Sequence, residues 1–244
     1  MNKLDYSEQL KLKRYNTPTI YNGLEKLVGT AMLSELCNQD EVRDFMPGMG
    51  SMIGYAVTVK IQPGEKSHAK CSARKWEAYR EYVASLDGPK IVVVQDLDRP
   101  LTYGAFWGEV NSNVHRALGC VGTITDGAVR DIDEMTNAGF KAIARRLCVG
   151  HAYSTPVEWG CEVFVFGTAV RPGQLIHADK HGFIIIPGQC EDRILDAAVF
   201  MDHNECNTLI KAARLAYSKT GEQIVAEINS AARSFGAAAN EKFK

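Results

Sequence analysis

The stretch from Gly104 to Met135 holds residue types that could do chemistry on a small organic acid. Arg130 carries a planar fork of hydrogen-bond donors, which suits a carboxylate. Asp131 follows it directly and offers the hard oxygen atoms that divalent cations such as Mg²⁺ take as ligands. A Gly-containing turn after a strand is expected to deliver these two side chains together to the start of a helix.

The same stretch predicts a cradle for an anion. Apolar residues recur at helical spacing after Gly108 and Glu109, and they define the expected inner face of a helix: Val110, Val114, Ala117 and Leu118. The first backbone N–H groups of such a helix have no intrahelical partner, so those near Val110 and Asn111 are expected to point toward an anion.

Each feature also has an ordinary structural interpretation. An Asp such as Asp131 is a common helix cap, an adjacent Arg130 is often only solvated, and Glu109 suits a helix start because of the helix dipole. The combination of an anion cradle, a guanidinium and a metal carboxylate within one unit is what predicts a site for a small oxo-acid.

Other chemical motifs are absent from the sequence. It has no GxxxxGK[ST], no GxGxxG after a strand and no GxSxG, which argues against nucleotide phosphate binding and a serine nucleophile. His177, His181 and His203 lack zinc spacing and are expected at the surface or in turns, and His115 is expected to face solvent. Among the tryptophans, all expected in the core or a cavity wall, only Trp107 lies near the proposed site in sequence.

The remaining elements alternate between helical and extended patterns. Helices are expected over 6–16, from Pro18, over 71–86 and from 192 onward, with a frayed tail after Phe235; Thr17 is expected to cap the second of them. Strands are expected over 53–61, 91–95, 120–125, 140–149 and 159–170, the third ending at Asp126-Gly127. Asp179 to Gly182 has hairpin-turn chemistry between two apolar runs. Asp96, Asp98 and Arg99 follow a buried strand, where α/β proteins often place functional groups.

Composition narrows the class of protein. The 244 residues include 28 basic and 29 acidic ones, so a net charge of -1 gives no electrostatic case for nucleic acid or an anionic membrane. No apolar run is long enough to span a bilayer, and the charged N-terminus does not resemble a signal peptide. The seven scattered cysteines suit reduced thiols, most of them in the core, so we expect a cytoplasmic protein with a small-molecule partner.

The sequence FWGEVNSNVHRALGCVGTITDGAVRDIDEM resembles the signature region of the regulator of ribonuclease activity A-like proteins, which include 4-hydroxy-4-methyl-2-oxoglutarate (HMG) aldolase/oxaloacetate decarboxylase. NTPTIYNGL, MPGMGSMIGYAVTV and PGQLIHADKHGFIIIP support the likeness, which spans most of the chain. The resemblance implies an α/β fold, an αββα sandwich like the phosphohistidine swivelling domain. We expect one domain over 1–244, with N-terminal helices in 1–45 and a C-terminal helical extension over 192–244 packed on the core.

The resemblance also implies a chemistry for this site. The backbone amides from Gly108 to Asn111 would hold the substrate carboxylate, Arg130 would bind substrate and steady an enolate, and Asp131 would anchor Mg²⁺ or Mn²⁺. Glu109 takes the place of an acid that contacts metal-bound water, and such a water is our hypothesis for the group that accepts the substrate hydroxyl proton. A homotrimer or homohexamer with sites between subunits is implied.

The leading hypothesis is therefore a metal-dependent lyase that cleaves a C–C bond of a 2-oxo (di)carboxylic acid to give pyruvate. Two alternatives stay open: a non-catalytic regulator that inhibits a ribonuclease by contact, and a related lyase or decarboxylase with another substrate. The family's aldolases draw a further acid from a neighbouring subunit's C-terminal region. Here that region does not align cleanly, and Glu205 and Glu222 are both candidates.

Overall fold

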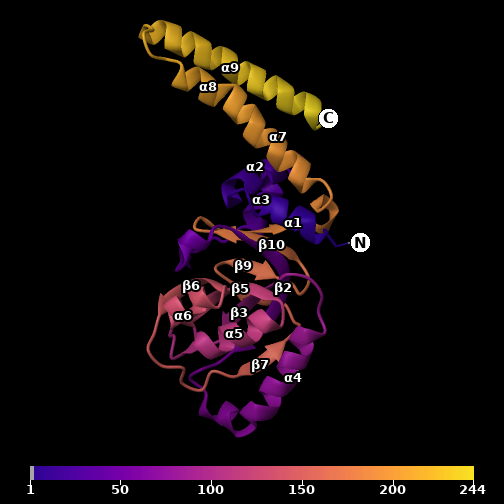
Figure 1. The fold of residues 1–244 in the computed structure, drawn as a ribbon, viewed down its shortest axis with the longest axis vertical. Helices are drawn as coiled ribbons and strands as arrows, with labels where there is room; N and C mark the ends of the chain where they lie inside the picture. Colours follow the sequence, from indigo (N-terminus) through magenta and orange to yellow (C-terminus); the bar gives the residue numbers. More distant parts are fainter. Residues whose placement is uncertain (1–2) are drawn as a thin grey trace.

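The computed structural model describes residues 3–244, and a mixed β-sheet forms its centre (Figure 1). The strands run in the order β1-β6-β5-β3-β2-β10-β11, while β4 pairs with β5 and β7 pairs with β2. Their bounds are β1 Arg43–Asp44, β2 Met52–Ile61, β3 Lys90–Asp96, β4 Ala105–Trp107, β5 Cys120–Val129, β6 Lys141–Leu147, β7 Pro156–Trp159, β10 Leu175–Asp179 and β11 Gly182–Ile186. A separate hairpin pairs β8, Val163–Val165, with β9, Thr168–Val170.

Strands β2, β3, β5 and β6 are parallel neighbours and are buried on both faces, which explains the apolar run IVVV in β3. Side chains alternate between two cores. Val92 and Val94 point to the face covered by α4 (Ser72–Ala84), α5 (Glu109–Ala117) and α6 (Ile132–Asn137). Ile91 and Val93 point to the other core, which also contains residues of β8 to β11. The sheet therefore curls around this second core and is nearly closed, like a barrel.

The N-terminal helices α1 (Tyr6–Leu12), α2 (Thr17–Val28) and α3 (Thr30–Leu36) pack on β2, β10 and β11 through a third apolar cluster. Asn16, not Thr17, caps α2, because its side chain accepts the Thr19 N–H at 2.8 Å. Thr17 instead donates its N–H to Asp179 and lies 3.0 Å from His177. Its burial in this contact explains why the expected cap is wrong.

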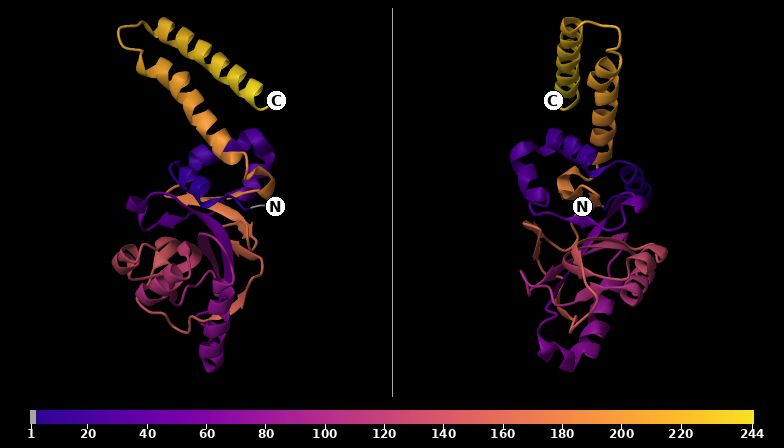
Figure 2. Two further views of the ribbon diagram at one scale, coloured as in Figure 1. Left: turned by 45° about the vertical axis from the view of Figure 1, so that its right-hand side comes forward. Right: turned by 90° about the vertical axis from the view of Figure 1, so that its left-hand side faces the viewer.

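The C-terminal helices form an arm (Figures 1 and 2). Helix α7 (Ile194–Asn207) packs against α2, where Gly23 permits the approach because an added Cβ would lie 2.9 Å from Ala198 N. Helices α8 (Leu209–Arg214) and α9 (Gly221–Lys242) contact α7 and each other and project away from the sheet. The expectation that all of 192–244 packs on the core is thus wrong beyond α7.

Helix α9 also corrects the expectation of a frayed tail after Phe235. A capping box at its start pairs Thr220 with Gln223, and the helix continues to Lys242. Its end returns to α7, since Lys242 Nζ lies 2.7 Å from Asp196 and Phe243 packs edge-on against Phe200. These two contacts with α7 stabilise the end of α9, where the sequence alone does not predict a helix.

Two strand predictions need correction. Asp126-Gly127 does not end the strand at Thr125, because β5 continues to Val129 through an irregularity in its pairing with β6. The long strand expected over 159–170 is divided into the end of β7 and the β8–β9 hairpin, whose turn places Phe166 and Gly167 at φ 49° and 78°. The hairpin at Asp179 to Gly182 is confirmed.

Short 3₁₀ helices complete the fold at Pro47–Met49, Lys66–Cys71 and Gly188–Cys190. The α/β class and the helical segments at both ends are as expected. The likeness to the phosphohistidine swivelling domain stays a prediction.

Candidate functional site

Two strand ends bring the predicted site residues together. Strands β4 and β5 are parallel neighbours, with Trp107 opposite Val129. Because the two strands are parallel, Gly108 and Arg130 leave the sheet at the same end, and a helix follows each of them closely. The backbone N–H of Arg130 donates to Trp107 O at 3.2 Å, which fixes the two chain segments side by side.

Asp131 adopts a left-handed backbone conformation, with φ 55° and ψ 49°. It precedes α6 but makes no side-chain cap to that helix. Its Oδ2 instead accepts the N–H of Glu109, the first residue of α5, at 3.1 Å, and lies 3.5 Å from Arg130 Nε. A non-glycine residue at positive φ is unusual, and here the conformation turns the carboxylate toward the neighbouring helix.

Gly108 makes the close approach possible. An added Cβ would lie 2.6 Å from Asp131 Oδ2 and 3.1 Å from Arg130 Nε. The backbone at Gly108 is extended, with φ -168°, so its role is steric. Any larger residue there would displace the carboxylate or the guanidinium.

A cavity of about 370 Å³ opens beside this pair. It contains the predicted site residues Gly108, Glu109, Val110, Asn111, Arg130 and Asp131, and its further walls come from α4, β4 and the loop after β6: Trp76, Arg80, Ala105, Phe106, Trp107, His151 and Ser154. The side chains of Arg130 and Asp131 are each 36% exposed, so their ion pair does not close the site. Arg130 is also held by a bond from Nη1 to Val149 O at 3.2 Å.

The first turn of α5 provides two open donors. The N–H of Glu109 is already bound to Asp131, but those of Val110 and Asn111 have no hydrogen-bond acceptor within residues 3–244. The Asn111 side chain faces the fold, where it donates to Phe106 O at 2.8 Å. A ligand carboxylate would therefore meet backbone N–H groups, not the Asn111 amide.

The expected inner face of α5 is wrong in part. Val110 is 77% exposed and Ala117 is exposed, while Ser112 and His115 are buried. The His115 ring lies 2.8 Å from Asn111 O and 3.1 Å from the Tyr79 hydroxyl, and burial lowers its pKa to about 4. A polar residue with two partners can occupy a core, so the prediction that His115 faces solvent fails.

The structure also corrects the sequence-based predictions for His177 and Trp76. His177 is buried, not in a turn, and burial lowers its pKa to about 4. Trp76 lines the same cavity as Trp107 and stacks on Phe106 at 5.0 Å, with Arg80 over its ring. Trp76 and Arg80 reach the cavity from α4, and His151 and Ser154 reach it from the loop after β6, so no local signal in the sequence identifies them.

The donor set suits a hydrated cation. Within residues 3–244 no three His, Cys, Asp or Glu side chains gather as a metal cluster. Asp131 Oδ1 and the exposed Glu109 carboxylate are available at the cavity, and Mg²⁺ is often held by one or two carboxylates while it keeps several waters. Asp131 and Glu109 therefore fit such an ion, with any further ligand supplied by water, substrate or another chain.

Two further features concern the molecule as a whole. In the part that the structure describes, no helix is both long and apolar enough to cross a membrane. The seven cysteines are all unpaired; only Cys120 and Cys190 are buried, so fewer are core residues than expected.

Comparison with known proteins identifies one matching family model and several distant relatives. A family model described as RraA-like, Aldolase/RraA, matches residues 18–185. A putative 4-hydroxy-4-methyl-2-oxoglutarate aldolase from Halalkalibacterium halodurans is 29% identical over 111 residues, 45% of this chain and 52% of that protein. Protein DlpA of Legionella pneumophila is 19% identical over 80% of this chain, which spans about a third of the length of DlpA (32%).

Solved structures share the fold. An uncharacterized protein from Pseudomonas syringae pv. tomato superposes with a TM-score of 0.69 at 20% identity, over 91% of this chain and 94% of that one. Streptomyces coelicolor RraAS2, described as an unusual member of the RNase ES inhibitor RraA protein family, gives 0.65 at 20% identity, over 85% and 96%.

Proposed function

Because this chain belongs to the RraA-like (Aldolase/RraA) family, we propose that it is a divalent-metal-dependent carbon–carbon lyase. Its substrate would be a small 2-oxo (di)carboxylic acid that is cleaved to pyruvate, as in an HMG aldolase or an oxaloacetate decarboxylase. The observation that carries the proposal is the convergence of Arg130, Asp131 and the open N–H groups of α5 on one accessible cavity.

Two sets of groups at the cavity would stabilise two different negative charges on the substrate. The N–H groups of Val110 and Asn111, at the positive end of α5, would bind a substrate carboxylate. Retro-aldol cleavage of HMG and loss of the carboxylate β to the keto group of oxaloacetate both leave the electron pair of the broken C–C bond in an enolate, with negative charge on the 2-oxo oxygen. Arg130 would offset that charge with a guanidinium that stays protonated and is already oriented by Val149 O.

Asp131 and Glu109 would hold Mg²⁺ or Mn²⁺. The bound ion would supply Lewis-acid stabilisation of the developing negative charge. The contact between Asp131 Oδ2 and Glu109 N orients the carboxylate and leaves Oδ1 for a ligand. The aromatic wall of Trp76, Phe106 and Trp107 would limit the water around the reacting bond.

We further propose a homotrimer or homohexamer in which a neighbouring C-terminal arm completes the site. Glu205 accepts a hydrogen bond from Asn22 of its own chain at 2.9 Å, whereas Glu222 lies in the exposed first turn of α9. Of the two candidates, Glu222 is therefore better placed to reach another subunit.

The test measures pyruvate release from HMG and from oxaloacetate with added Mg²⁺, corrected for metal-only decarboxylation. We expect Arg130→Ala to lower kcat/KM by about 100-fold or more, because it removes a fixed donor at the developing charge. EDTA should abolish turnover, and Mg²⁺ or Mn²⁺ should restore it.

The matched control is Arg146→Ala, which removes an exposed arginine from β6 outside the cavity and should leave kcat/KM unchanged. Turnover that survives both Arg130→Ala and EDTA would exclude this site. Turnover with other 2-oxo acids alone would assign a related lyase. Inhibition of a ribonuclease by a protein without lyase activity would assign the regulatory role instead.

A further inference from the structure

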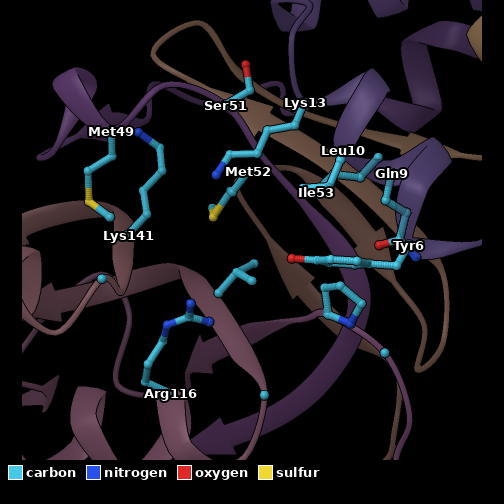
Figure 3. Close-up of a pocket in the computed structure, with 15 residues that line it drawn as sticks. Tyr6, Gln9, Leu10, Lys13, Met49, Ser51, Met52, Ile53, Arg116 and Lys141 are labelled. Carbon is cyan, nitrogen blue, oxygen red and sulfur yellow. The ribbon is translucent and has the colours of Figure 1, made fainter.

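A second cavity lies at the opposite end of the sheet from Arg130. It measures about 510 Å³ and is formed by α1, the start of β2 and the loops that precede β3, β5 and β6 (Figure 3). Gly119 lies here at the start of β5, whereas Arg130 follows its end. At the usual rise of a strand, the two sites are about 30 Å apart.

The cavity is basic. Lys13, Arg116 and Lys141 line it, and none of its lining residues within 3–244 carries a carboxylate. Lys141 is neutralised by Asp44, with Nζ to Oδ2 at 2.6 Å. Lys13 and Arg116 form no ion pair with the described residues, and Arg116 makes only a long bond to Cys120 O at 3.4 Å. Two uncompensated cations that face one space favour an anion.

The side chains converge on one place although they come from separate elements. In Figure 3 the Lys13 amine, the Tyr6 hydroxyl and the Arg116 guanidinium point into the same central space. Tyr6 is the first residue of α1 and Lys13 follows its end, whereas Arg116 extends from the last turn of α5.

An apolar wall lies beside these charges. It includes Leu10, Met52, Ile53 and Val121, together with the Tyr6 ring. Tyr6 and Leu10 are 62% and 46% exposed, so a ligand body that covered them would remove apolar surface from water. The cavity thus combines an anion-binding side with a side for a hydrocarbon body.

Gln9 lies in the wall of the cavity. The residue is 2% exposed, its Nε2 donates to Leu4 O at 2.9 Å, and its Oε1 has no donor within residues 3–244. This oxygen has no surface exposed to the cavity, so Gln9 forms part of the wall and offers a ligand no acceptor.

From this arrangement we propose a second binding site, for a small carboxylate with a ring-sized apolar body. The carboxylate contacts Lys13 and Arg116, and the body lies along Leu10, Met52 and Val121. The site is independent of the proposed lyase chemistry.

Isothermal titration calorimetry of the intact protein with benzoate tests the proposal. We expect saturable binding in low salt, and at least tenfold weaker binding of the neutral isostere benzamide. Lys13→Gln and Arg116→Gln should each weaken binding of the acid about tenfold, because each removes a charge-assisted contact. Both side chains are exposed, so the fold should tolerate the changes.

Two controls locate the site. Lys11→Gln alters the same helix outside the cavity and should leave the affinity unchanged. Arg130→Ala should also leave it unchanged, so this result does not depend on the lyase test. Absence of saturable binding, equal binding of acid and amide, full affinity in both cavity variants, or loss of binding in Arg130→Ala would each overturn the proposal.

Discussion

At the scale of single residues, the site depends on where one carboxylate points. Asp131 could have capped its own helix, which is the ordinary role of an aspartate at that position. The left-handed backbone turns it to the first N–H of α5 instead, next to Arg130 Nε. The same carboxylate therefore orients the guanidinium and keeps one oxygen at the cavity.

Gly108→Ala should disturb this arrangement without unfolding the protein. The new Cβ would lie 2.6 Å from Asp131 Oδ2, while the extended φ of -168° is accessible to alanine. We expect kcat/KM for pyruvate release to fall by up to about 100-fold, as small displacements of reacting groups do, with little change in the thermal midpoint.

Gly150→Ala is the matched control, because no atom lies within 4 Å of its added Cβ and it belongs to the same end of the sheet. It should keep both activity and thermal midpoint. Full activity in Gly108→Ala would show that the close packing of Gly108 against Asp131 has no part in turnover.

At the scale of elements, the neighbouring strands β3 and β5 carry a pair of buried acids, Asp96 and Asp126. Asp126 Oδ1 accepts the N–H of Asp96 at 2.8 Å, and Asp96 Oδ1 accepts that of Asp98 at 3.0 Å. Asp96 is 1% exposed and its Oδ2 has no partner in the described chain. Burial raises the pKa of Asp96 from 3.8 to about 7 and that of Asp126 from 3.8 to about 6.

This burial predicts a pH-dependent stability. With a raised pKa, Asp96 binds more protons in the folded state than in the unfolded state. Its contribution to the free energy of unfolding therefore declines as the pH rises from about 4 to about 7. Asp96→Asn removes the titration. Relative to the parent, the variant should gain in free energy of unfolding across that range, by no more than about 1.4 kcal/mol per pH unit.

Urea unfolding of both proteins at several pH values between 4 and 7.5 measures the difference. Comparison of the pair also removes the opposing effect of His115 and His177, whose lowered pKa values favour the folded state as the pH rises from about 4. A difference that stays constant over this range would contradict the prediction.

At the scale of the whole molecule, the C-terminal arm is separate from the site of its own chain. Helices α8 and α9 extend beyond α7, on the side of the N-terminal helices, while the Arg130 cavity lies at the β4 and β5 ends (Figures 1 and 2). An acid on the arm, such as Glu222, can therefore serve the proposed chemistry only in another subunit.

Subunit complementation tests this arrangement. Removal of 208–244 should leave the core folded, since α7 keeps its contact with α2, but should lower kcat/KM about 10- to 100-fold through the missing acid. Coexpression of the truncated chain with Arg130→Ala should restore part of the activity, because a mixed oligomer pairs an intact cavity with an intact arm.

The two parent variants expressed alone are the controls, with oligomeric mass measured for each. A truncated chain that retains full activity would rule out a contribution from the arm. Mixed oligomers with no more activity than either parent would place all catalytic residues within one chain.

The sequence alone determined the local features of this protein. Hairpin chemistry at Asp179 to Gly182 and the adjacency of Arg130 and Asp131 depend only on near neighbours along the chain, so they were predictable. Tertiary structure decided the rest. Pairing of β4 with β5 brings Gly108 beside Arg130, and packing of α4 against the site adds Trp76. These contacts join distant segments, and burial there outweighs the local preference of a residue.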